Sequence, residues 1–183
     1  MMVKEPLAGR VKTRLGRDIG MTAAAWWFRH QTRALIRRLR DPRWQLILAV
    51  SPDKQGLTSR IWPGDLPRVA QGSGNLGTRM KHLFDILPPG PAVIIGADIP
   101  GVAKRHIDSA FRSLGSHDAV IGPSPDGGYW LIGLNRQRPT PPDLFANVRW
   151  SSENTLSDTL LTLKDHRIAH VDTLNDVDTA ADL

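Results

Sequence analysis

The sequence contains no cysteine in 183 residues, which excludes disulfide bonds, thiol nucleophiles and cysteine-ligated zinc. It has no apolar run near the roughly 18 residues of a membrane-spanning helix, and no charged segment followed by an apolar one at its start. Its six histidines are scattered without the spacing of metal ligands, and no G-x-S-x-G motif anchors a serine hydrolase. We therefore expect a globular, cytoplasmic protein with no membrane span.

Positive charge is concentrated at the start of the chain. Residues 1–43 contain eleven Lys and Arg against three Asp and Glu, a net charge of +8, whereas residues 44–183 contain thirteen against fifteen, a net charge of −2. Part of the excess lies on an arginine-rich segment over residues 29–40, and a basic helix can attract nucleic acid. A nucleic-acid-binding protein is therefore an alternative. The slightly acidic charge of residues 44–183 and the lack of an RNA-binding aromatic motif argue against it.

Helices and strands alternate along the chain, which is typical of α/β proteins. With no repeat and no linker, the pattern predicts a single domain over residues 1–183, a three-layer Rossmann-like sandwich with a mostly parallel sheet. Only three residues precede the first charged loop, so the first strand is either very short or begins upstream. Expected helices cover 21–39, 57–62, 76–87, 104–114 and 152–163, and expected strands cover 44–50, 68–71, 118–122, 129–134 and 167–171, besides one that leads into residue 98.

That strand ends in the most informative residue, Asp98. Four apolar residues and two small ones precede it, as in a strand covered on both faces. Ligands of open α/β sheets bind at the carboxyl ends of strands, where an Asp can hold Mg²⁺ or Mn²⁺ against nucleotide phosphates. The alternative is that Asp98 only caps the next helix.

A basic loop precedes the first expected helix. It contains Gly9, Arg10, Lys12 and Arg14, and it follows Lys4. Backbone N–H groups, a helix N-terminus and several cations together form an anion site, although the P-loop spacing is missing. The loop is therefore a candidate phosphate-binding segment, and a plain surface loop is the alternative.

A glycine-rich turn lies between a strand and a helix, from Gln71 to Arg79. Gly74 and Gly77 lie within it, and glycine lets a backbone approach a ligand closely. Gln71 could read a nucleobase edge and Arg79 could reach a phosphate. The alternative is a loop that merely requires positive φ angles.

Two later segments are candidates for binding an acceptor. Asp126, Gly128 and Tyr129 belong to a turn between two apolar strands, and Trp150 and Glu153 precede the last long helix. A carboxylate pair beside an aromatic wall suits an acceptor hydroxyl. Hairpin chemistry for Asp126, helix capping for Glu153 and core packing for Trp150 are the alternatives.

Five motifs in register resemble the bacterial glycosyltransferases of the GT-A, nucleotide-diphospho-sugar transferase type, whose distant relatives include the molybdenum-cofactor and phospholactate guanylyltransferases. The resemblance covers nearly the whole chain, and it departs at Asn75, where most members carry Asp. The motifs are K-x-P-x-x-G-R-V-K-T-R-L (4–15), G-x-L-G-x-R-M (74–80), V-I-I-G-A-D-x-P-G (93–101), H-D-x-V-I-G-P-x-x-D-G-G-Y-x-L-I-G-L (117–134) and W-S-S-E (150–153).

The resemblance implies a metal-dependent transferase that uses a nucleoside triphosphate or a nucleotide-sugar and a small-molecule acceptor. It makes Asp98 the counterpart of the metal-binding Asp, and we expect Asp126 as a second ligand or base and Lys12 and Arg14 as stabilisers of the leaving group. Nucleotidyl and glycosyl transfer both remain open, as does a non-catalytic homologue. The sequence does not indicate an oligomeric state.

Overall fold

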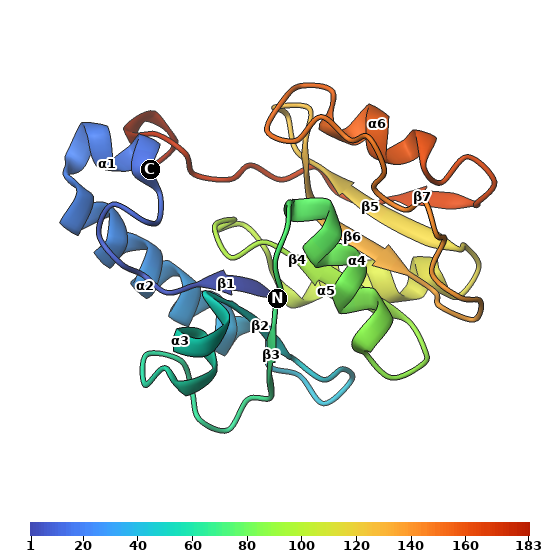
Figure 1. Cartoon of the computed structure of the whole chain (residues 1–183), viewed down its shortest axis with the longest axis horizontal. Helices are drawn as coiled ribbons and strands as arrows, with labels where there is room; N and C mark the ends of the chain where they lie inside the picture. The colour runs from blue at the N-terminus through green and yellow to red at the C-terminus, as the bar shows by residue number, and fades with distance from the viewer. The chain divides into compact units, whose positions relative to one another are not determined.

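The computed structural model describes residues 1–183, which fold as two compact units, each assembled from separate segments of chain (Figure 1). The first unit contains Met1–Gln71, Gly96–Lys104 and Asn175–Leu183, and the second contains Gly72–Ile95 and Arg105–Leu174. The single domain expected over residues 1–183 stays a prediction.

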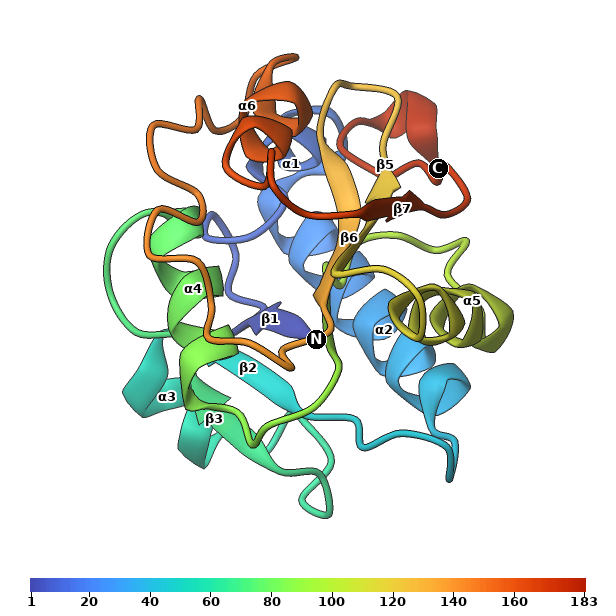
Figure 2. The same ribbon diagram turned by 90° about the vertical axis from the view of Figure 1, so that its right-hand side faces the viewer.

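A three-stranded sheet forms the centre of the first unit, in the order β1-β2-β3, and both strand pairs are parallel (Figures 1 and 2). The carboxyl ends of its strands therefore lie at one edge, where Glu5 follows β1 and Gln71 follows β3. The elements of this unit are β1 (Met2–Lys4), α1 (Thr13–Ile19), α2 (Met21–Leu39), β2 (Leu48–Ser51), α3 (Asp53–Thr58), β3 (Arg68–Ala70) and the 3₁₀ turn η1 (Ala180–Asp182).

The long helix α2 has the extent that the sequence predicts. Ala24, Phe28, Leu35, Ile36 and Leu39 recur at helical spacing and are buried, while the arginines of its opposite face reach solvent. No helix of the chain combines the length and the apolar composition that crossing a membrane requires.

A four-stranded sheet in the order β4-β6-β5-β7 forms the second unit. Here β6 is antiparallel to both neighbours. A turn of only five residues joins it to β5, and a parallel pair would need a longer crossover. Its elements are α4 (Leu76–Ile86), β4 (Ala92–Ile95), α5 (Lys104–Leu114), β5 (Ala119–Pro123), β6 (Tyr129–Leu134), α6 (Thr155–Leu161) and β7 (Ile168–His170).

Three of the five strand pairs are parallel, so the expected α/β class with mostly parallel pairing is confirmed. The expected strand over 44–50 begins only at Leu48. Trp44 instead returns to the end of α2, where its indole N–H donates to the carbonyl of Leu39 at 2.8 Å and the Arg43 guanidinium lies 4.9 Å from its ring centre.

Candidate functional site

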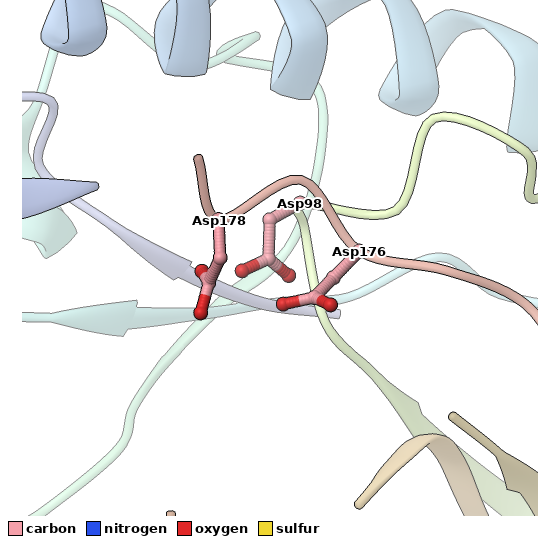
Figure 3. A group of neighbouring side chains, drawn as sticks. All are labelled: Asp98, Asp176 and Asp178. Atoms are coloured by element: carbon pink, nitrogen blue, oxygen red, sulfur yellow. The ribbon is translucent and has the colours of Figure 1, made fainter. Parts of the chain in front are cut away.

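Three carboxylates of the first unit gather at one place. Asp98 follows β4 in the sequence, and Asp176 and Asp178 come from the segment before η1. One oxygen from each lies within 4.8 Å of the others. Figure 3 shows the three side chains directed to the same side, with Asp98 between the other two. Each is about one third exposed, so the group is accessible to a ligand.

Asp176 and Asp178 lie on the same face of an extended segment, in which successive side chains point to opposite faces. Residues i and i+2 lie on one face of such a segment and the residue between them lies on the other. Val177 is accordingly buried against Leu15 and Ala24, and its N–H donates to the carbonyl of Asp98 at 3.2 Å. Its burial therefore fixes both flanking carboxylates beside Asp98.

The segment around Asp98 is also anchored. Ala97 and Ile99 are buried on either side, and the guanidinium of Arg38 donates to the carbonyls of Pro100 and Val102 at 2.5 and 2.9 Å. A Cβ at Gly96 would lie 2.9 Å from an oxygen of Asp98, so the glycine makes room for this carboxylate. The position of Asp98 is thus determined by packing and not by helix capping.

Lys12 reaches into the cluster. Its Nζ lies 2.6 Å from Asp98 Oδ2, 2.7 Å from Asp178 Oδ1 and 3.9 Å from Asp176 Oδ2, and its side chain is only 7% exposed. Burial alone lowers the pKa of Lys12, but the charge of Asp98 and the hydrogen bonds to Asp178 and Asp98 outweigh it and raise the pKa above its ordinary value. Lys12 is therefore a buried cation at neutral pH.

Arg14 completes the group from its exposed side. Its guanidinium donates to Asp178 Oδ2 at 3.0 Å, and its side chain is 65% exposed. Burial raises the pKa of Asp178, yet the hydrogen bonds and charges of Lys12 and Arg14 dominate and hold that pKa below its usual range. Three carboxylates against two cations leave one negative charge in excess.

The rest of the basic loop is exposed. Lys4 lies on β1, and Arg10 and Gly9 lie in the turn before α1, where Gly9 has a φ of 74°. No hydrogen bond or ion pair holds the side chains of Lys4 and Arg10. They are free to contact a ligand, and their role in binding phosphate stays a prediction.

The members of the glycine-rich turn fall into different units. Gln71 belongs to the first unit, is 2% exposed, and donates through Nε2 to the carbonyls of Val3 and Ala49. Gly74, with a φ of 97°, precedes Asn75, whose side chain caps α4 by accepting from the N–H of Thr78. Gln71 thus braces two strands, and its expected contact with a base stays a prediction.

Gly77 has a packing role in α4. A Cβ there would lie 2.6 Å from the Trp150 ring and 2.7 Å from Phe145. Trp150 is half-buried, and its indole N–H has no partner. Two residues after Gly77, the Nε of Arg79 lies 3.5 Å from the carbonyl of Asn75. These contacts place Trp150 on the N-terminal turn of α4.

The two segments expected to bind an acceptor meet in the second unit. Gly127 has a φ of 84°, and a Cβ there would lie 2.2 Å from the carbonyl oxygen of Glu153. The N–H of Leu156 also donates to the carbonyl of Gly127 at 2.8 Å. The turn of Asp126 therefore lies directly against the segment of Glu153, and both of these side chains are exposed.

Other contacts in this region are structural. One oxygen of Asp126 accepts from the N–H of Gly128 at 2.9 Å, which closes the turn. The hydroxyl of Tyr129 accepts from Thr159, and burial raises the pKa of this tyrosine. Glu153 lies before the first turn of α6, which begins at Thr155 with Asn154 as its N-cap. The acceptor roles of these residues, and Asp126 as a metal ligand, stay predictions.

The carboxylate cluster fits a divalent cation such as Mg²⁺ or Mn²⁺. Such cations take carboxylate oxygens as ligands, and the three carboxylates carry more negative charge than Lys12 and Arg14 neutralise. Asp176 and Asp178 lie outside the five sequence motifs. The signal that points to them is the D-V-D spacing, which puts two carboxylates on one face of an extended segment around a core valine.

The chain is similar to proteins that are described as transferases. The chain matches the crystal structure of a "putative nucleotide-diphospho-sugar transferase" from Desulfovibrio desulfuricans G20 with 30% identity and a TM-score of 0.85, over 97% of this chain and 80% of that one. A 2-phospho-L-lactate guanylyltransferase from Methanocaldococcus fervens is 29% identical over 104 residues, 55% of this chain. The match covers 48% of that relative, and a match to another guanylyltransferase covers 26%.

A more distant structure shares the fold. A protein from Mycobacterium tuberculosis H37Rv, crystallised with manganese, is 16% identical with a TM-score of 0.51, over 85% of this chain and 82% of that one. The nucleotidyl or sugar transferase-like fold is therefore established. The family described as "Uncharacterized protein conserved in bacteria (DUF2064)" matches residues 34–152, and the chain belongs to this family.

Proposed function

We propose that this protein is a metal-dependent nucleotidyltransferase, which moves the nucleoside monophosphate part of a nucleoside triphosphate onto a small-molecule acceptor and releases pyrophosphate. The observation that carries the proposal is the buried Lys12 ammonium among three carboxylates, with Arg14 beside it. Metal ligands and fixed cations in one place are what phosphoryl transfer requires. The similarity to guanylyltransferases supports the same reaction class.

Asp98, Asp176 and Asp178 would hold Mg²⁺ or Mn²⁺. The bound ion would neutralise charge on the phosphate oxygens and act as a Lewis acid. Asp178 is held in place by Lys12 and Arg14, and Asp98 is held by the buried residues around it. The ligands are therefore positioned before a metal arrives.

Lys12 and Arg14 would stabilise the departing pyrophosphate. Because its pKa is raised, Lys12 keeps its charge throughout the physiological range. A cation fixed where negative charge develops lowers the barrier without reorganisation. Lys4, Gly9 and Arg10 would extend this anion site along the loop.

The remaining residues would bind the rest of the substrates. In this proposal Gly74, Gly77 and Arg79 contact the nucleotide, and Asp126 acts as the base that receives a proton from the acceptor. Glu153, whose segment lies against the turn of Asp126, would orient the same acceptor. Gly128, Tyr129 and Trp150 would form the wall of its site.

Glycosyl transfer is the second candidate, since the similar structure from Desulfovibrio desulfuricans is described as that of a nucleotide-diphospho-sugar transferase. Both reactions use a nucleotide diphosphate group near a cation. They differ in the bond that breaks, and hence in the product: pyrophosphate in one case and a nucleoside diphosphate in the other.

A thermal-shift panel of nucleoside triphosphates and nucleotide-sugars, with and without Mg²⁺ or Mn²⁺, tests the proposal first. We expect metal-dependent stabilisation by triphosphates, which Asp98→Asn removes and Asp143→Asn keeps, because Asp143 is exposed and far from the cluster in sequence. Pyrophosphate release with phosphate- or carboxylate-bearing acceptors then identifies the reaction. Stabilisation by nucleotide-sugars alone, with nucleoside diphosphate release, would favour glycosyl transfer instead.

A further inference from the structure

Glu5 is a carboxylate that the fold buries without a hydrogen-bond donor. The residue is 8% exposed, and its Oε1 has almost no contact with solvent and no partner. Its backbone N–H donates to the carbonyl of Ser51 at 2.8 Å, so Glu5 extends the pairing of β1 with β2 by one residue. The carboxylate therefore lies at the carboxyl edge of the parallel sheet.

The alternation of side chains along the strand explains why position 5 is buried. It does not explain why the buried residue is a glutamate. Glu5 shares a strand face with Val3, which is 1% exposed, while the intervening Lys4 is exposed. An apolar side chain would satisfy the same position without cost. A buried carboxylate that lacks a donor is unfavourable, and such groups in folded proteins call for a functional explanation.

Gln71 is the other buried polar side chain at this edge, and its amide N–H groups already donate hydrogen bonds. Gln71 donates through Nε2 to the carbonyl of Val3 at 3.1 Å and to that of Ala49 at 2.8 Å. These bonds connect β1 with β2 and fix the amide in place. Glu5 Oε1, by contrast, has no hydrogen-bond partner.

We propose that Glu5 reads the base of the nucleotide and selects guanine, an inference that rests on the proposed function. A carboxylate can only accept hydrogen bonds. On its base-pairing edge, guanine presents two adjacent donors, N1–H and the 2-amino group. Adenine and cytosine present a donor beside an acceptor, and uracil presents one donor between two acceptors, so each would turn a lone pair toward the carboxylate.

The position of Glu5 in the chain agrees with this role. Glu5 begins the loop that Lys12 ends, and both belong to the first unit. A nucleotide lying along this loop would place its base at the sheet edge and its phosphates at the cations. Charge-assisted N–H bonds to a buried carboxylate are among the stronger ones, so the selection should be substantial.

The test is calorimetric titration of the wild-type protein and Glu5→Gln with GTP, ITP and ATP in the presence of Mn²⁺. For the wild type, we expect GTP to bind roughly 5- to 150-fold more tightly than ATP. ITP, which keeps N1–H but lacks the 2-amino group, should fall between them. Glu5→Gln should lose the preference for GTP while ATP still binds.

Asp165→Asn, the same change from acid to amide at an exposed position, should keep the wild-type ratio. A Glu5→Gln variant that keeps the ratio, or a wild type that binds ATP or ITP as tightly as GTP, overturns the proposal and leaves the proposed function standing. Absence of binding by any nucleotide overturns both. If Glu5→Gln fails to fold, the wild-type comparison of GTP with ITP decides alone.

Discussion

The backbone N–H of Val177 donates to the carbonyl of Asp98 at 3.2 Å, although 79 residues separate them in the sequence. The bond joins the only two segments that contribute carboxylates to the cluster. Val177 therefore connects the core of the first unit with the candidate metal site.

Shortening the side chain of Val177 should lower both the stability of the protein and its affinity for a metal ion. Val177→Ala removes buried methyl groups beside Leu15 and Ala24, and we expect a loss of roughly 1–2 kcal/mol in unfolding free energy. Mn²⁺ affinity should fall as well, because the flanking carboxylates lose their anchor. Urea denaturation and metal titration measure the two effects, and unchanged metal affinity in a destabilised variant would separate packing from the site.

Removing Lys12 should act in opposite directions on metal and nucleotide. Lys12→Met deletes the cation that shares the three carboxylates, so we expect Mn²⁺ alone to bind more tightly. Pyrophosphate release should drop by at least 100-fold, as expected for loss of a group that stabilises transition-state charge. Parallel calorimetry and turnover assays test this, and weaker binding of Mn²⁺ alone would contradict the shared-carboxylate interpretation.

The pairing of Asp178 predicts a defined pH dependence. Its pKa is lowered in the folded state, so the stability it contributes is present above the unfolded pKa of about 4 and is lost as pH falls through the folded value. The stability difference between wild type and Asp178→Asn should thus be constant near neutral pH and shrink below about pH 4. Denaturation at a series of pH values measures this difference in stability. A difference that grows on acidification would contradict a lowered pKa for Asp178.

Gly77 offers a test of the packing around Trp150. An alanine in a helix ordinarily stabilises by about 1 kcal/mol relative to glycine. Here its Cβ would lie 2.6 Å from the Trp150 ring, so we expect Gly77→Ala to destabilise the protein and to alter its tryptophan fluorescence. Gly64→Ala, in a turn where nothing lies within 4 Å of the added carbon, is the control for an alanine that meets no neighbour.

Gly127→Ala should be the most disruptive of the glycine substitutions. It combines a φ of 84° with a Cβ placed 2.2 Å from a backbone oxygen of Glu153, and backbone yields less readily than a side chain. We expect a large fall in melting temperature. A melting temperature near that of the wild type would mean that the turn of Asp126 moves away from Glu153 at little cost.

The sequence was sufficient for what depends on local pattern. The helix over 21–39 and the strand before Asp98 follow from apolar spacing. The helix agrees in extent with α2, whereas β4 ends at Ile95, three residues before Asp98. Trp44 was misassigned to a strand, because only tertiary contacts show that its indole returns to Leu39.

The sequence predicts only part of the candidate site, because local patterns do not show which distant segments come together. Asp98 and Lys12 belong to motifs, and the structure brings them together. Asp176 and Asp178 lie in a segment without regular structure, where their partner is 78 or more residues away. Glu5 resembles a loop charge in the sequence, since its burial depends on strand pairing that no local pattern encodes.

The separation between Lys12 and Asp178 also bears on what holds the first unit together. These ion-pair partners are 166 residues apart, so their contact closes a long loop and has an entropic cost. Metal binding to the three carboxylates would therefore link these distant segments and stabilise the folded first unit.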